Sequence, residues 1–171
     1  SRRRRACRRR SRRPQVTLKT GPVTVRVPAT SANLGPGFDA LGMALSWYDD
    51  VTAEVIEAGL TFDIEGEGAD EVPRDETHLL YRAMDATFDL LGERPTGLHL
   101  TCRNTIPHGR GLGSSAAAIA AGVFLARALT SDGHLLLDDE ALFRLATDLE
   151  GHPDNVAPAL AGGFTISWID G

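Results

Sequence analysis

The sequence predicts an α+β domain, and the order of its strand-like and helix-like segments carries this prediction. Segments in which apolar residues alternate predict strands, and most of them lie in the first third of the chain. Segments with helical spacing follow, with one strand-like segment among them and another at the end. The resulting order, β-β-β-α-β-α-α-β, lacks the strict strand–helix alternation of a doubly wound sheet. At 171 residues the chain has room for one domain, or for one domain and part of another.

Five places are expected to form strands. A sixth segment, 60–64, has the same character but is short. Residues 23–27 (VTVRV) alternate, and Pro28 is expected to end that strand. The others are 40–47 and 51–57, joined at Tyr48-Asp49-Asp50, then 98–103 and 164–169. Residues 14–22 are interpreted as a linker, and 66–77 as a surface loop rich in Gly, Asp, Glu and Pro.

Three longer segments are expected to be helices. Residues 78–91 place apolar side chains on one face, with Gly92 as the stop signal. Residues 114–129 are small or aliphatic on nearly every face, which is typical of a buried helix. Residues 138–150 are amphipathic, with Asp138 or Asp139 as N-cap. His78, His99 and His134 lack metal-ligand spacing and are interpreted as structural or surface residues.

Charge is distributed unevenly along the chain. Residues 1–13 (SRRRRACRRRSRR) hold nine of the 18 basic residues and no acidic one, which leaves nine basic against 23 acidic residues and a formal charge of −14 for residues 14–171. This acidic body argues against a nucleic-acid-binding surface on the folded part, and it is ordinary for a cytoplasmic enzyme. No run of about 18 apolar residues occurs, so we expect no membrane span.

The arginine run has three interpretations. It could bind a polyanion such as nucleic acid. It could be a targeting segment, but no apolar segment follows it, which excludes a secretory signal. The favoured interpretation is a disordered tail, or sequence translated from upstream of the true start, because a single lysine (Lys19) against 17 arginines fits GC-rich coding DNA.

A glycine-rich loop, IPHGRGLGSSAAAIAAG at 106–122, precedes the buried helix. It has no Walker lysine, since the only lysine is Lys19, and its Gly109-x-Gly111-x-Gly113 spacing is not that of a dinucleotide fold. Glycine backbone and a helix N-terminus can still bind phosphate if a metal supplies positive charge. Ser114 and Ser115 are candidates to cap the helix, touch phosphate or hold Mg²⁺. A plain helix cap without a ligand is the alternative.

Three segments together carry a family resemblance. The segments PATSANLGPGFDALG (28–42), IPHGRGLGSSAAA (106–118) and LEGHPDNVAPALAGGF (149–164) resemble motifs of the GHMP kinases, which include galactokinases, homoserine kinases and mevalonate kinases. The first and third segments are similar to the homoserine kinase versions. The resemblance covers about residues 22–171.

The resemblance implies a fold and a domain organisation. It implies the α+β sandwich named after ribosomal protein S5 domain 2, with residues 21–171 as the GHMP kinase N-terminal, ATP-binding domain. Residues 1–20 would be a disordered Arg-rich extension and linker. The family's C-terminal ferredoxin-like domain is missing from the sequence, so the domain is interpreted as truncated at its C-terminal end and the piece alone as inactive or weakly active.

The resemblance also implies residues for the nucleotide and metal. The expected ATP-binding residues form one run: Pro107, His108, Gly109, Arg110, Gly111, Leu112, Gly113, Ser114, Ser115, Ala116 and Ala117. Arg110 could touch a phosphate or be simply exposed. Ser115, or Ser114, and Glu150 are expected to hold Mg²⁺, a hard cation that takes a few protein oxygens together with phosphate.

The expected substrate is L-homoserine, with Asn33, Asp39, His152 and Asn155 as its contacts. Turn capping is the alternative role for Asn33 and Asp39. Asp154 and Asn155 are the candidate catalytic residues, with Asp154 as general base or, alternatively, as N-cap of the following helix. The implied reaction is phosphorylation of the side-chain hydroxyl of L-homoserine by ATP, a step toward threonine, by a phosphotransferase with an alcohol acceptor.

Two other functions stay open at this stage. One is another GHMP small-molecule kinase of the mevalonate type. The other is an S5-like RNA-binding module with a basic arm, against which the acidic body argues. We expect no nucleic-acid partner and no membrane partner, and the sequence leaves open whether the chain forms a homodimer.

Overall fold

Five strands form one sheet in the computed structural model, which describes residues 16–36 and 40–168. The strands are β1 (Val23–Ala32), β2 (Leu41–Val55), β3 (Gly59–Gly66), β4 (Gly97–Asn104) and β5 (Phe164–Ile166). Their order is β1-β2-β4-β3, and β5 pairs with the beginning of β2. Only β3 and β4 run parallel, because α1 connects them, whereas the other pairs are antiparallel. The predicted α+β class is confirmed.

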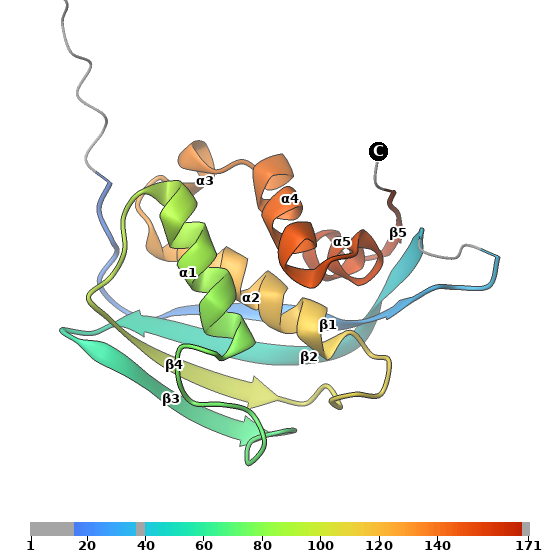
Figure 1. Cartoon of the computed structure of the whole chain (residues 1–171), viewed down its shortest axis with the longest axis horizontal. Helices are drawn as coiled ribbons and strands as arrows, with labels where there is room; N and C mark the ends of the chain where they lie inside the picture. Colours follow the sequence, from blue (N-terminus) through green and yellow to red (C-terminus); the bar gives the residue numbers. More distant parts are fainter. Residues whose placement is uncertain (1–15, 37–39, 169–171) are drawn as a thin grey trace, which may run out of the picture.

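The helices all cover one face of the sheet, which gives the two-layer arrangement in Figure 1. They are α1 (Leu79–Leu91), α2 (Ser114–Leu129), α3 (Gly133–Leu136), α4 (Asp139–Glu150) and α5 (Pro153–Ala161). The three predicted helices correspond to α1, α2 and α4. The four-residue helix α3 was not predicted, since a single turn has too few residues to show periodicity.

The core lies between the sheet and α1 and α2. Alternate residues of the strands point toward the helices, among them Val27, Val51 and Leu100. Helix α2 lies against α1 and β1, and residues on most of its faces are buried, as its composition predicted. A Cβ on Gly122 of α2 would lie 2.5 Å from the Leu80 carbonyl oxygen of α1, so the two helices approach closely there.

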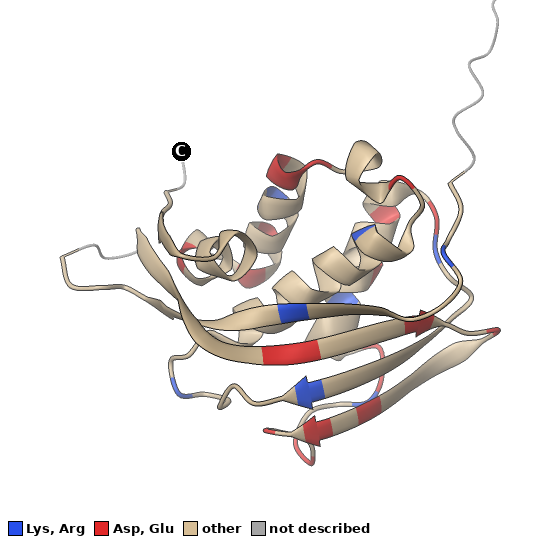
Figure 2. Ribbon diagram, turned by 180° about the vertical axis from the view of Figure 1, so that it is seen from behind, with Lys and Arg blue, Asp and Glu red and all other residues tan. Residues whose placement is uncertain are grey.

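The opposite face of the sheet is polar. Figure 2 shows basic and acidic residues interspersed along the strands. Arg26 forms a two-pronged contact with Asp50, at 2.7 and 2.8 Å, and Thr24 hydrogen-bonds to Thr52 across β1 and β2. The alternation of polar and apolar residues along β1 and β2 follows from one solvated and one buried face.

Two strand predictions were wrong in the same region. The predicted strands 40–47 and 51–57 form one strand, β2, because Asp49 and Asp50 remain in the ladder opposite Val27 and Arg26. Pro28 does not end β1. The strand continues to Ala32 with a shift of register between Pro28 and Thr30, and a proline is tolerated there because β1 is an edge strand.

Two further expectations differ near the ends of the chain. The last strand ends at Ile166, so it is shorter than the predicted 164–169. Within the expected linker 14–22, Lys19 N donates to Leu129 O at 2.7 Å and Ser131 N donates to Thr17 O at 2.8 Å. These residues therefore attach to the end of α2. The interpretation of the arginine run at 1–13 concerns residues outside the described ones.

Candidate functional site

The glycine-rich loop connects β4 to α2 and has the backbone of an anion-binding loop. Gly109, Gly111 and Gly113 have φ values of 65°, 71° and 66°, in the left-handed region that glycine adopts most readily. Left-handed residues next to ordinary ones turn backbone N–H groups toward a common concave side. The helix N-terminus adds the first-turn N–H groups of α2, which have no partner within the helix.

The cap of α2 differs from one of the predicted alternatives. The N-cap residue is Gly113, and within the described residues no side chain caps this helix end. Ser114 and Ser115 are the first two residues of α2 and do not cap it. A glycine N-cap leaves the N–H groups of the first turn available to a ligand, so the correction strengthens the prediction of a phosphate site.

Asp49 of β2 fixes the entry of the loop. Its Oδ1 accepts hydrogen bonds from the backbone N–H groups of Thr105 at 2.6 Å and Ile106 at 2.9 Å. Burial of the carboxyl raises its pKa, and these two hydrogen bonds partly oppose that shift. Asp49 thus attaches the loop to the sheet immediately before Pro107.

Ser115 and Glu150, the two predicted metal ligands, are brought together by the fold. The Ser115 hydroxyl donates to Glu150 Oε1 at 2.5 Å, from the first turn of α2 to the last residue of α4. The Ser115 residue is exposed and Glu150 is half-buried, so an ion could reach both oxygens. Among the described residues, no cluster of three or more His, Cys, Asp and Glu side chains could hold a metal.

The HPDN segment begins helix α5. Its N-cap is His152 and not Asp154, since Pro153 is already the first helical residue. His152 Nδ1 lies 2.9 Å from Asp154 Oδ1 and 3.4 Å from Asp154 N. We assign the proton to Nδ1 and the hydrogen bond to Oδ1, because the shorter contact is the stronger one. Asp154 is buried, with its side chain 5% exposed, and its Oδ1 also accepts from Asn155 N at 2.8 Å.

Thr30 of β1 joins this segment to the glycine loop. Its hydroxyl donates to Asn155 Oδ1 at 2.8 Å, and its backbone N donates to Leu112 O at 3.0 Å. A Cβ on Gly113 would lie 1.9 Å from Thr30 Oγ1 and 3.1 Å from Asn155 Oδ1. Only a glycine fits there, so the three motifs that carried the family resemblance meet at one point.

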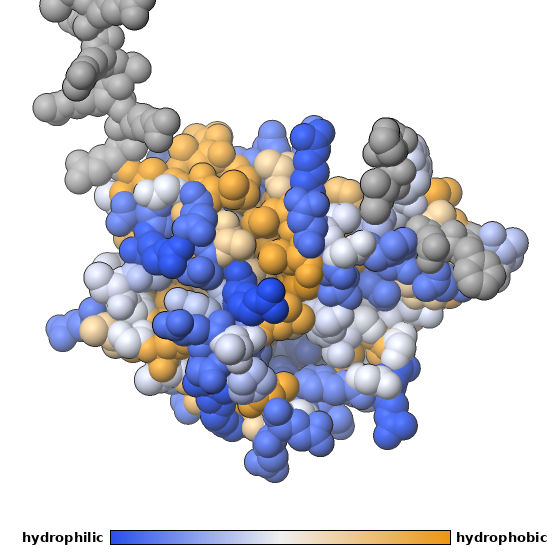
Figure 3. Space-filling model, viewed as in Figure 1, coloured by the Kyte–Doolittle hydropathy of each residue, from blue (hydrophilic) through white to orange (hydrophobic). Residues whose placement is uncertain are grey.

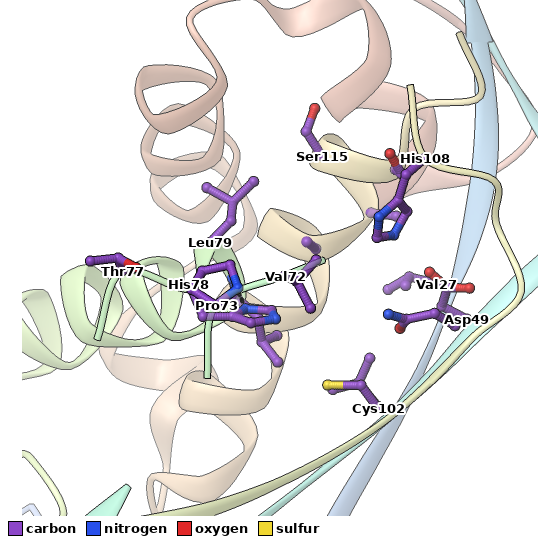
Figure 4. Close-up of a pocket in the computed structure, with 16 residues that line it drawn as sticks. Val27, Asp49, Val72, Pro73, Thr77, His78, Leu79, Cys102, His108 and Ser115 are labelled. Atoms are coloured by element: carbon purple, nitrogen blue, oxygen red, sulfur yellow. Dashed lines mark hydrogen bonds between the residues drawn. The ribbon is translucent and has the colours of Figure 1, made fainter. Parts of the chain in front are cut away.

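A cavity of about 320 Å³ lies beside the loop, between the beginnings of α1 and α2. In Figure 3 it corresponds to the hollow near the N-terminal end of α2. Figure 4 shows Ser115 and His108 at its upper end, Val72, Pro73 and His78 on one side, and Val27, Asp49 and Cys102 opposite. Over the full lining, which also includes Val51, Leu79, Leu80, Ala117 and Ala118, apolar residues are in the majority, as is common for sites that accept part of a small organic ligand.

His78 presents a hydrogen-bond donor at this cavity. As N-cap of α1, its Nδ1 accepts from Leu80 N at 3.2 Å, so the proton of the neutral ring is on Nε2. Nε2 is buried and has no hydrogen-bond partner within the described residues. The ring stacks on Phe62 with 4.9 Å between centroids, and burial lowers the pKa of His78.

The remaining predicted residues belong either to the glycine-rich loop or to the first motif. Of the loop residues, Gly109, Arg110 and Gly111 are exposed, whereas Ala116 and Ala117 are buried beneath the first turn of α2. Arg110 is in the exposed position that was one of its two interpretations. Asn33 is exposed, with a φ of 58° just after β1. Asp39 lies outside the described residues.

Three residues of the site were not singled out from the sequence: Thr30, Asp49 and His78. Thr30 was within the predicted first motif, but only the fold reveals its contact with Asn155. Asp49 was assigned to a turn, and a carboxyl in the middle of an alternating pattern was the signal that could have identified it. His78 was interpreted as structural or surface; it is indeed structural as a helix cap, and it also lines the cavity.

Comparison with known proteins identifies the class. The chain belongs to the GHMP kinase family: residues 78–163 match the GHMP kinases N terminal domain. Among curated relatives, the homoserine kinase of Streptomyces coelicolor is 62% identical over 153 residues, which cover 90% of this chain and 50% of the relative. The homoserine kinase of Mycolicibacterium smegmatis is 50% identical over 156 residues, covering 90% of this chain and 49% of the relative.

Solved structures agree with this membership. A Listeria monocytogenes protein assigned as a homoserine kinase superposes with a TM-score of 0.69 at 40% identity, covering 88% of this chain and 51% of that one. The Methanococcus jannaschii mevalonate kinase superposes with a TM-score of 0.64 at 16% identity, covering 88% and 56%, which shows the shared fold alone. The chain spans about half the length of the curated relatives it matches.

Nothing in the described helices indicates a membrane segment. Within residues 16–36 and 40–168, no helix has the length and the apolar character needed to cross a bilayer.

Proposed function

We propose that this chain provides the ATP-binding part of a homoserine kinase, which transfers the γ-phosphoryl group of ATP to the side-chain hydroxyl of L-homoserine. The observation that carries the proposal is the Ser115–Glu150 contact of 2.5 Å at the N-terminal end of α2, behind a loop with three left-handed glycines. The 62% identity to a homoserine kinase supports the choice of substrate.

The nucleotide would occupy the loop and the adjoining cavity. Backbone N–H groups of 109–116 and the positive end of the α2 dipole would bind the phosphates. The base would enter the cavity against Val72 and Pro73, where the ring of His78 also lines the wall. No lysine is needed in this arrangement, which accounts for the departure from a Walker loop.

Ser115 and Glu150 fit a magnesium ion. One hydroxyl and one carboxylate leave most coordination positions to phosphate oxygens and water, the arrangement that Mg²⁺ favours in phosphoryl-transfer sites. The ion would neutralise charge on the phosphates during transfer. The two side chains already lie within hydrogen-bond distance of each other, so little rearrangement is needed for both to bind one ion.

The amino-acid substrate would bind between the first and third motifs. We propose that His152 and Asn155 contact it, together with Asn33 and Asp39. With its Nδ1–H donated to Asp154, the His152 ring is fixed in orientation beside Asn155. The burial of Asp154 favours a role in orienting His152 and Asn155 over one as general base, because a base must reach the hydroxyl it deprotonates.

The proposal is tested by phosphoryl transfer on a substrate panel. The whole gene product is mixed with Mg·ATP and either L-homoserine, mevalonate or galactose, and ADP release and the phosphorylated product are measured. We expect product with L-homoserine only. Turnover of mevalonate instead would support the mevalonate-type alternative, and no turnover of any alcohol would contradict the proposal. The same assay on residues 1–171 tests the expectation that this piece alone is weakly active or inactive.

A further inference from the structure

Thr30 occupies the point at which β1, the glycine loop and α5 come together. The residue is fully buried, at 0% exposure, although its side chain is polar. Its hydroxyl reaches Asn155 on α5, and its backbone N–H reaches Leu112 in the loop. The buried hydroxyl forms a hydrogen bond with a side-chain amide 125 residues away in sequence. Such a bond indicates that Thr30 does more than fill space in the core.

The hydrogen-bond pattern determines which way the Asn155 amide points. Asp154 Oδ1 accepts from the backbone N of Asn155 and lies 3.5 Å from its side-chain nitrogen. An ionised carboxylate only accepts hydrogen bonds, so the amide atom nearest to it is Nδ2. Oδ1 therefore faces Thr30, and the threonine hydroxyl must donate to it.

This orientation leaves a donor for a ligand. The Asn155 amide nitrogen carries two N–H groups, and its one contact within residues 16–36 and 40–168, with Asp154 Oδ1, uses at most one of them. The other can donate to an oxygen acceptor such as a carboxylate, a hydroxyl or a phosphate. If the amide were flipped, it would present an acceptor to the same ligand and lose this interaction.

The same residue also sets the distance between Asn155 and the loop. Thr30 Oγ1 fits against Gly113 only because Gly113 lacks a Cβ, and the bond from Thr30 N to Leu112 O attaches the loop immediately before the N-cap of α2. One side chain therefore contacts the residue that begins the phosphate-binding helix end and the residue predicted to contact the amino acid.

We propose that Thr30 is a positioning residue for phosphoryl transfer: its hydroxyl holds the Asn155 amide as a hydrogen-bond donor toward the amino-acid substrate, next to the end of the glycine loop. This inference rests on the proposed function for the identity of the substrate. The hydrogen bond itself can be examined independently.

The kinetic test compares Thr30→Val with Thr30→Ser in the whole gene product. Valine has a similar volume without the hydroxyl, whereas serine keeps the hydroxyl. We expect Thr30→Val to raise the KM for L-homoserine about tenfold while KM for Mg·ATP changes less than threefold, and we expect Thr30→Ser to restore the homoserine KM to within about threefold of the parent. A homoserine KM unchanged in Thr30→Val would overturn the inference.

A double variant separates positioning from general damage. If Thr30 acts through Asn155, Thr30→Val added to Asn155→Ala should cause no further rise of the homoserine KM, although each single variant does. Multiplication of the two effects would overturn the inference. Melting temperatures of all variants are measured in parallel, because a purely structural role would lower the melting temperature and raise both KM values together.

A spectroscopic measurement on residues 1–171 distinguishes failure of the inference from failure of the proposed function. The side-chain N–H resonances of Asn155 are identified by their loss in Asn155→Ala. We expect them to shift in Thr30→Val and to stay near the parent position in Thr30→Ser. If the resonances follow this pattern but homoserine is not a substrate, the proposed function and the substrate role of Thr30 both fail while the orienting hydrogen bond stands. If they do not respond to Thr30→Val, the inference fails whatever the substrate.

Discussion

At the scale of single residues, Ser115 and Glu150 give the most direct prediction. Removing the carboxylate in Glu150→Gln should weaken binding of a non-hydrolysable ATP analogue about tenfold in the presence of Mg²⁺, which corresponds to about 1.4 kcal/mol. Binding without Mg²⁺ should change little, because the loop backbone is intact. Titration calorimetry with and without the metal measures both quantities.

The matched control for that variant is Glu140→Gln on the same helix. Glu140 pairs with Arg144 on the surface, so its replacement should leave nucleotide affinity unchanged in both conditions. An equal loss of nucleotide affinity in the two variants would show that the net charge of α4, and not the Ser115–Glu150 pair, governs binding.

His78 gives a pH-dependent prediction. Burial lowers its folded-state pKa below the ordinary value of 6.5, so at intermediate pH the unfolded chain binds a proton that the folded chain does not. The contribution of His78 to stability is therefore complete above pH 6.5 and is lost as pH falls toward the lowered pKa. Nearby His108 adds to the lowering and Asp75 opposes it.

The measurement compares unfolding free energies of the parent and His78→Asn across pH 5 to 8. Asparagine can still cap α1, so the variant should fold, and its stability should fall less steeply below pH 6.5. His134→Gln, at an exposed position, serves as the control and should follow the parent. Identical pH profiles for the parent and His78→Asn would contradict the assignment of a neutral, buried ring.

At this scale, the sequence identified some residues of the site and missed others. Ser115, Glu150, His152 and Asn155 were identified because they belong to motifs whose residues are near one another in sequence. Thr30 and Asp49 act through partners 125 and 56 or 57 residues away, and local patterns contain no information about such partners. Their roles become visible only once β1, β2 and the loop are placed in three dimensions.

At the scale of elements, the attachment of the glycine loop to β2 can be tested at Asp49. Asp49→Ala should destabilise the fold by about 1–3 kcal/mol, because the buried N–H groups of Thr105 and Ile106 lose their acceptor. Asp49→Asn should cost less, since both hydrogen bonds end on one oxygen, which an amide can supply. Urea unfolding measures both changes, and equal losses in the two variants would contradict this account.

The packing of α1 on α2 is testable at Gly122. A methyl group there would lie 2.5 Å from the Leu80 carbonyl oxygen and 2.7 Å from Ala83 Cβ, so Gly122→Ala should force the helices apart at a cost of about 1–3 kcal/mol. Alanine has the higher helix propensity, so propensity alone predicts the opposite sign. Ala128→Ser, on the same helix at a half-buried position, is the control and should shift the unfolding midpoint only slightly.

The predicted elements succeeded where apolar periodicity is long and failed where tertiary contacts override local signals. Residues 78–91 show sustained helical spacing and residues 114–129 are apolar on nearly every face, and α1 and α2 match these two predictions closely. Tyr48-Asp49-Asp50 has the composition of a turn, yet Arg26 on the neighbouring strand and the loop N–H groups satisfy both carboxylates and keep β2 continuous. Pro28 is tolerated for a related reason, since an edge strand needs no donor on its outer side.

At the scale of the whole molecule, Cys102 reports on the integrity of the core. It is 2% exposed, and burial raises its pKa to about 12, so thiolate is negligible near pH 8. In a Cys7→Ser background, a thiol reagent should react with the native protein only as fast as the fold opens. In urea, where the protein is unfolded, the same reagent should modify one thiol per chain immediately. Immediate reaction of the native protein would show that the cavity beside Cys102 admits solvent freely.

The overall architecture was predicted mainly by the three motifs and only partly by periodicity. Periodicity gave the α+β class, and the apolar composition of residues 114–129 gave one buried helix, but strand order and the single covered face of the sheet depend on long-range pairing that no local pattern encodes. The parallel pairing of β3 and β4 around α1 is an example. The relation to ribosomal protein S5 stays a prediction from the resemblance.

The junction of Thr30, Gly113 and Asn155 also has a consequence for how the protein is made. Thr30 leaves the ribosome long before Asn155, and closing a loop of 125 residues has a conformational-entropy cost that contacts between neighbouring strands do not have. Strands β1 to β4 and the glycine loop can therefore be in place while α5, β5 and the proposed amino-acid side of the site are still unformed. During synthesis the protein would acquire the means to hold a nucleotide first, and the means to hold an acceptor only when α5 reaches β1.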